Sequence, residues 1–188
     1  LGENRGGPEE WLRQAMLFQR YRESEIATEL IDKAMEMFPD SLPLVDAKDR
    51  SLLFDGKSGD VERLFDTHLA AFPERGREIG QLIEDLGLVE EARSFYEVTA
   101  AKGGANADLW VDAARMAYEA GDWKGCNGSL DRYIRESGNS AESREAVGLF
   151  FLERENTRAA ERYLKEAYRK APERERTTFA LAGIYGGQ

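Results

Sequence analysis

The chain has 188 residues, of which 33% are charged, and its formal net charge is −10. An acidic surface neither displaces the counterions of nucleic acid nor docks on anionic lipid, and the sequence lacks an apolar run long enough to span a membrane. The single cysteine, Cys126, excludes an internal disulfide framework and a cysteine zinc site.

The stretch from Trp11 to Pro39 carries a pattern that recurs along the chain. Large and small residues alternate at spacings of three, four or seven, which is typical of one face of a helix, and the polar residues 20–25 interrupt it. The residues of the pattern are Trp11, Ala15, Phe18, Ala27, Ile31, Ala34 and Pro39. This order resembles the tetratricopeptide repeat (TPR), a helix–turn–helix unit of about 34 residues. The resemblance implies an all-α, right-handed α-solenoid of stacked helix–turn–helix repeats.

On this resemblance, residues 1–7 form a flexible lead-in and residues 8–188 form a single TPR array. The repeats are expected at about 8–41, 42–72, 73–106, 107–140 and 141–174, with a partial sixth repeat at 175–188. The second repeat departs furthest from the family pattern. Lys48 and Asp49 stand where the family has leucine and a small residue, and His68 stands at another small-residue position.

The fourth repeat has a recognisable turn and a glycine-containing second helix. Gly121-Asp122-Trp123 resembles the turn between the two helices of the family, in which glycine provides the required backbone freedom. Gly125 and Gly128 lie in the predicted helix that follows, and each costs about 1 kcal/mol relative to alanine. We therefore expect this helix to open before the other interior helices.

The fifth repeat is regular, and only the first helix of a sixth repeat follows it. The pattern residues of the fifth are Val147, Gly148, Phe151, Ala160, Leu164, Ala167 and Pro172. Because no second helix follows the last segment, we expect Phe179, Ile184 and Tyr185 to form an exposed apolar patch and the protein to continue as part of a larger one.

The sequence gives no indication of catalysis, a metal or a cofactor. Gly56-Lys57-Ser58 lacks the first glycine and the preceding strand of a phosphate-binding loop, so we expect a solvated turn there. His68 is the only histidine, and no further ligands at helical spacing accompany it. Cys126 occupies a small-residue packing position and is predicted to be a core thiol. We therefore expect a protein that is not an enzyme.

The resemblance implies a non-catalytic protein-binding scaffold that uses the concave groove of the array, within a larger multi-domain protein or assembly. Two alternatives remain: a scaffold segment of a bacterial exopolysaccharide synthesis or secretion protein, and an oligomerisation spacer that associates end to end. A chaperone-type carboxylate clamp is not expected, because its positions hold Leu12, Met16, Ala47, Glu74 and Glu78. The sequence does not distinguish the bacterial cytoplasm from the periplasm.

Mapping the inward-facing positions of the family onto the first helices places an arginine in almost every repeat. The mapped arginines are Arg13, Arg50, Arg77, Arg115 and, in the last helix, Arg176, and Met16 and Tyr118 are assigned to the same groove. Because a guanidinium group can bind a carboxylate through two hydrogen bonds, we expect an acidic protein or peptide segment, or an anionic polymer, as the partner. In the alternative, the arginines pair with neighbouring Glu78, Glu84 and Asp112 at little net gain in stability.

Overall fold

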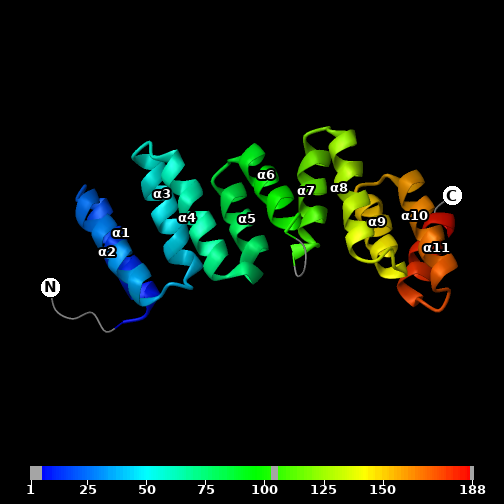
Figure 1. The fold of residues 1–188 in the computed structure, drawn as a ribbon, viewed down its shortest axis with the longest axis horizontal. Helices are drawn as coiled ribbons and strands as arrows, with labels where there is room; N and C mark the ends of the chain where they lie inside the picture. The colour runs from blue at the N-terminus through cyan, green and yellow to red at the C-terminus, as the bar shows by residue number, and fades with distance from the viewer. Residues whose placement is uncertain (1–5, 103–105, 187–188) are drawn as a thin grey trace. The chain divides into compact units, whose positions relative to one another are not determined.

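The computed structural model describes residues 6–102 and 106–186, and these residues form helices, turns and loops without a strand. Of the expected lead-in, only Gly6 and Gly7 belong to the described part, and residues 187–188 of the expected sixth repeat lie outside it. The elements are α1 (Pro8–Arg20), α2 (Ser24–Met37), α3 (Leu42–Phe54), α4 (Ser58–Ala71), the short 3₁₀ helix η1 (Pro73–Arg75), α5 (Gly76–Asp85), α6 (Val89–Ala100), α7 (Leu109–Glu119), α8 (Trp123–Glu136), α9 (Ala141–Glu153), α10 (Thr157–Lys170) and α11 (Glu175–Gly186) (Figure 1).

The helices follow one another with the regularity of a repeat. The odd-numbered helices begin at residues 8, 42, 76, 109, 141 and 175, that is, about every 34 residues. Short turns join each of the first five to the next even-numbered helix. The all-α, helix–turn–helix prediction is therefore confirmed. By their internal contacts the residues group into two compact units, Leu1–Leu88 and Val89–Gln188, and each unit is described separately below.

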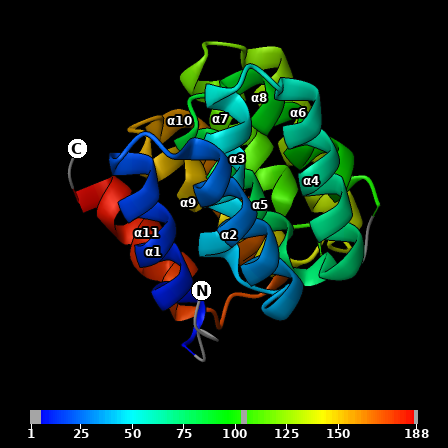
Figure 2. The same ribbon diagram turned by 90° about the vertical axis from the view of Figure 1, so that its left-hand side faces the viewer.

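The first unit is built from α1 to α5. Consecutive helices pack together, and the first helices of the repeats also touch, α1 against α3 and α3 against α5. Figures 1 and 2 show α1 and α2 running side by side. Their interface is a cluster of buried side chains: Ala15 from α1, and Ala27, Leu30 and Ile31 from α2. The alanines allow the two backbones to approach closely, and the larger residues fill the space beside them.

The second unit is built from α6 to α11, and its core extends from α7 to α11. Gly148 of α9 shows how closely two helices approach there. A Cβ atom at this position would lie 2.7 Å from Cγ of Leu164 on α10, so that only glycine fits without a shift. Phe151 and Tyr163 stack across the same pair of helices with ring centroids 5.8 Å apart. Cys126 is fully buried in this core, as predicted.

The turn at Gly121 has the predicted form. Gly121 has a φ of +74°, which favours glycine, and α7 ends just before it. Asp122 then caps α8, because its side chain accepts a hydrogen bond from the backbone N–H of Gly125 at 2.9 Å. The same cap type recurs at Ser140 before α9 and at Asn156 before α10. The polar residues between the helices therefore set where each following helix begins.

One expectation about the last helix is wrong in part. Phe179 and Tyr185 are exposed, as expected, but Ile184 is only 6% exposed and packs with Leu181 in the core of the second unit. Ile184 lies three residues after Leu181 and therefore shares its buried face of the helix. Phe179 lies on the other side of α11. The apolar residues of this helix thus divide between two faces instead of forming one patch.

Candidate functional site

A groove of about 440 Å³ lies along α1 in the first unit. Five residues line it, all from α1: Arg13, Met16, Leu17, Gln19 and Arg20. Two of them are large apolar side chains that remain in contact with solvent, since Met16 is 63% and Leu17 50% exposed. Large apolar side chains that remain exposed beside a hollow are typical of a contact surface.

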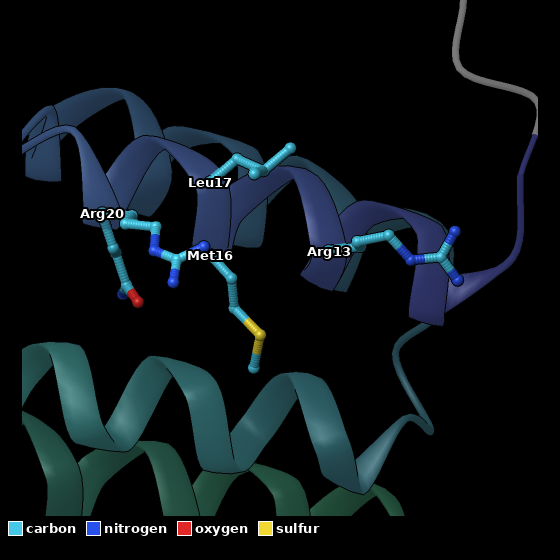
Figure 3. Close-up of a pocket in the computed structure, with 5 residues that line it drawn as sticks. Arg13, Met16, Leu17 and Arg20 are labelled. Atoms are coloured by element: carbon cyan, nitrogen blue, oxygen red, sulfur yellow. The ribbon is translucent and has the colours of Figure 1, made fainter.

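The two arginines of the groove lie at its opposite ends. They are seven residues apart, which is two helical turns or about 10 Å along the axis. Figure 3 shows Met16 pointing from α1 toward the neighbouring helix, with the side chain of Arg20 beside it, and Arg13 pointing toward the N-terminal end of α1. Leu17 points to the opposite side of the helix from Met16. The groove therefore offers an apolar centre with a cation at each end.

The two cations differ in their partners. Arg13 donates a hydrogen bond from Nη1 to Glu10 Oε2 at 3.1 Å, and both side chains are largely exposed. The side chain of Arg20, by contrast, makes no hydrogen bond or ion pair with any of the residues 6–102 and 106–186. An exposed pair of the Arg13–Glu10 kind contributes a few tenths of a kcal/mol, so a ligand carboxylate can replace Glu10 at small cost. A ligand carboxylate that binds Arg20 does not have to displace any residue of the described ranges.

The other mapped arginines of the first unit lie on separate helices and do not line this groove. Arg50 of α3 is held by Asp46, one turn earlier, through hydrogen bonds from Nε of 2.9 and 3.0 Å. This pairing raises the pKa of Arg50 above its ordinary value. Arg77 is exposed near the start of α5 and has interactions of its own within the chain. Arg50 is therefore paired with a neighbouring carboxylate, as in the alternative, but this carboxylate is Asp46 and not one of the three that were expected.

The mapped residues of the second unit are tied to their own surroundings. Arg115 lies 3.7 Å from Glu119 on the same helix. Tyr118 donates a hydrogen bond from its hydroxyl to the backbone carbonyl of Arg154 at 3.3 Å, and its ring packs edge-on against Trp123. Arg176 is exposed at the start of α11. Tyr118 is thus part of the packing between helices, and the groove of α1 brings together only Arg13 and Met16 of the predicted set.

Three residues of the groove were not among the predicted site residues: Leu17, Gln19 and Arg20. The sequence contained a usable signal, because Arg13, Met16, Leu17 and Arg20 stand at positions i, i+3, i+4 and i+7 of one helix. The mapping onto family positions selected one arginine per repeat and so passed over Arg20, which ends α1. That Arg20 has no partner among the described residues could only be seen in three dimensions.

Other candidate chemistry is limited among the described residues. No group of three or more histidine, cysteine, aspartate or glutamate side chains within residues 6–102 and 106–186 could hold a metal ion. In the same ranges, no helix has both the length and the apolar character needed to cross a bilayer. His68 is buried on α4 and its Nε2 has no hydrogen-bond partner in the described part of the chain. Burial lowers its pKa, and Arg75 lowers it further.

Comparison with known proteins gives similarity at the level of the fold. No family model matches the chain, and no curated protein sequence matches it significantly. Among solved structures, it is similar to TTC0263, a thermophilic TPR protein of Thermus thermophilus, with 16% identity, a TM-score of 0.48, and coverage of 95% of this chain and 99% of the other. A tetratricopeptide repeat protein from Parabacteroides merdae has 14% identity, a TM-score of 0.46, and coverage of 95% and 72%.

A third similar structure is YrrB, described as a TPR protein with an unusual peptide-binding site, with 16% identity, a TM-score of 0.44, and coverage of 95% of this chain and 93% of the other. The helix–turn–helix pairs of the present chain, with first helices about every 34 residues, are of the TPR type. The predicted resemblance is therefore confirmed for the fold.

Proposed function

We propose that this chain is a non-catalytic scaffold that binds a protein segment, and that the groove of α1 receives an acidic segment with an apolar side chain at its centre. The observation that carries the proposal is the sequence of groups along the groove: a guanidinium group at Arg13, the exposed thioether of Met16, and a second guanidinium group at Arg20. Carboxylates on the ligand would bind the two ends, and an apolar side chain would cover Met16.

The charge of the chain supports an anionic ligand at this place. The chain as a whole carries a net charge of −10, so a local pair of cations stands out against an acidic background. A ligand with negative charge is repelled by the net charge of the chain and attracted by this pair of arginines, which favours one binding register. The apolar centre of the groove favours a peptide over an anionic polysaccharide, because a sugar chain has no large apolar side chain with which to cover Met16.

The experiment is a fluorescence-polarisation titration of the whole chain with a labelled helical peptide that carries glutamates seven residues apart and a leucine between them. We expect saturable binding that weakens as salt is raised. Arg20→Glu should weaken it at least tenfold, and Met16→Ala several-fold. The matched control is Arg63→Glu, which makes the same charge change at an exposed arginine of α4 that is paired with Asp60 outside the groove.

Three further titrations decide between the proposal and its rivals. A peptide with lysines in place of the glutamates should not bind. A uronic-acid oligosaccharide that displaces the peptide from Arg20 would assign the groove to an anionic polymer instead. Equal weakening by Arg20→Glu and Arg63→Glu would show that only overall charge matters, and would contradict binding in the groove.

A further inference from the structure

Asp49 of α3 occupies the small-residue position of its first helix, and it breaks the packing rule of the repeats there. At the equivalent position the other repeats have alanine or glycine: Ala15, Gly80, Ala114 and Gly148. All five positions are buried, and Asp49 is 0% exposed. A carboxyl group therefore stands where the rest of the chain uses a hydrogen atom or a methyl group to let two helices meet.

The carboxyl group of Asp49 is also isolated from hydrogen-bond partners within the described residues. Neither Oδ1 nor Oδ2 makes a hydrogen bond to any residue in the ranges 6–102 and 106–186. A buried polar group without a partner is costly, and a buried charge without one is much more so.

From this geometry we propose that the α3–α4 pair is a proton-controlled latch, which is closed while Asp49 is neutral and opens when Asp49 loses its proton. The charged form cannot remain in the closed interface, because no described residue there binds it, and separation of α3 from α4 gives it water. The inference stands apart from the proposed function, since it concerns the interior of the second repeat and needs no ligand.

The charged groups around Asp49 fit this behaviour. Burial, together with the negative charge of nearby Asp46, raises the pKa of Asp49 to about 8, although the positive charge of Arg50 lowers it in part. Arg50 is engaged with Asp46. The negative charge of Asp85 of α5 raises the pKa of Arg50, but Asp85 is not among the groups that shift the pKa of Asp49.

The remaining helices packed on α3 bring no direct partner for Asp49 in the described part of the chain. Asp32 of α2 pairs with Lys48 at 2.6 Å, α1 contributes the exposed Arg13 and Arg20, and α4 contributes Asp60, Arg63 and His68. Of these groups, His68 has to be considered in the pH dependence of opening, because its ordinary pKa of 6.5 is lowered in the closed state.

The signs of the two titrations define the pH window of the test. Asp49 has a higher pKa in the closed state than its ordinary 3.8, so it stabilises the closed state at low pH and loses this effect as pH rises to about 8. His68 has a lowered pKa, so its effect is opposite; it fades as pH rises through its ordinary pKa of 6.5 and is small by pH 8. On opening, Asp49 releases about one proton at pH 6.5 and about half a proton at pH 8, and uptake at His68 offsets part of this at the lower end, so the opening equilibrium should rise about tenfold over the whole window.

The experiment is amide hydrogen exchange on the whole chain at pH 6.5 and 8.0, corrected for the intrinsic pH dependence of exchange, with residues 141–170 as internal reference. In the unaltered chain, the opening equilibrium of residues 42–71 should be about tenfold larger at pH 8.0 than at pH 6.5. Asp49→Asn and Asp49→Ala should both remove this dependence and increase protection at pH 8.0. Asp66→Asn, the same change at an exposed position of α4, should behave like the unaltered chain.

Each contrary outcome overturns the latch. If protection of residues 42–71 is the same at both pH values, Asp49 does not titrate in the closed state. If Asp49→Asn keeps the full pH dependence, another group is responsible. If Asp49→Ala or Asp49→Asn lowers protection or fails to fold, the carboxyl group stabilises the interface, which contradicts the reasoning from its isolation.

Discussion

The ion pair between the buried Glu145 of α9 and the partly exposed Arg174, just before α11, allows a quantitative prediction. Glu145 is 3% exposed and accepts hydrogen bonds from Arg174 Nη2 at 3.0 Å, from Arg174 Nε at 3.2 Å, and from the hydroxyl of Thr177. The bonds from Arg174 hold the pKa of Glu145 below its ordinary value of 4.5, against the effect of burial. The pair therefore stabilises the folded chain above about pH 4.5, and this contribution is lost as pH falls through the lowered pKa.

The perturbation is Arg174→Ala, which leaves a buried carboxylate without its counterion. Removing one partner of a fully buried pair costs about 3–5 kcal/mol, and the partial exposure of Arg174 places the cost here at or below the lower end of that range. The carboxyl group of Glu145 can limit the loss of folding stability by taking up a proton. Protonation costs about 1.4 kcal/mol for each pH unit above the ordinary pKa of the group, which is about 3 kcal/mol at pH 7. At pH 5.5 the same protonation costs only about 1.4 kcal/mol. Arg174→Ala should thus lower the free energy of unfolding by about 3 kcal/mol at pH 7 and by about half of that at pH 5.5.

Urea denaturation followed by circular dichroism, at both pH values, measures these differences. Glu145→Leu combined with Arg174→Met should come within about 1 kcal/mol of the unaltered chain, because neither member of the pair then carries a charge. Arg158→Ala, at an exposed arginine of α10, should change the free energy of unfolding by less than about 0.5 kcal/mol. A loss below about 1 kcal/mol for Arg174→Ala at pH 7, or a loss that does not shrink at pH 5.5, would refute the reasoning.

Two further predictions concern α8. Gly128→Ala should raise the free energy of unfolding by about 1 kcal/mol, because the added Cβ would meet open space. Gly125→Ala should lower the free energy of unfolding, because the added Cβ would overlap the side chains of Arg93 and Asp122, which are paired at 2.8 Å. Urea titration of the two variants checks this, and an equal gain in both would contradict it. Burial raises the pKa of the Cys126 thiol to about 11. Ellman's reagent at pH 8 should therefore label the native chain at least a hundredfold more slowly than the urea-unfolded chain. Equal labelling rates would show that the thiol is accessible in the native chain.

Local sequence patterns predicted the fold because its packing is local. Ala15 and Ala27 are small where α1 meets α2, and their spacing along each helix is visible in one dimension. The same holds for Gly121, whose turn conformation depends on its own backbone. The grouping of residues 8–188 into a single array is a statement about how distant parts are placed, and it stays a prediction, as does the binding role of Arg50, Arg77, Arg115 and Tyr118.

The candidate site and the buried charges depended on information that no spacing contains. Arg13 and Arg20 are alike in sequence, yet Glu10 pairs with the first and nothing in the described chain pairs with the second. Glu145 and Arg174 are 29 residues apart and meet only because α10 returns the chain to α9. Asp49 was recognised as out of place for the family, but only the structure shows that both of its oxygens lack partners among residues 6–102 and 106–186.

The succession of packed helices within each unit has a consequence for the synthesis of the chain. The described helix contacts in each unit join elements that are consecutive, or next but one, along the chain. Closing such short loops costs little entropy, and folds with contacts between nearby residues form quickly. A chain growing from the ribosome therefore acquires the partner for each new helix before the following repeat is made. Its exposed apolar faces are covered early, so the nascent chain presents little surface for aggregation.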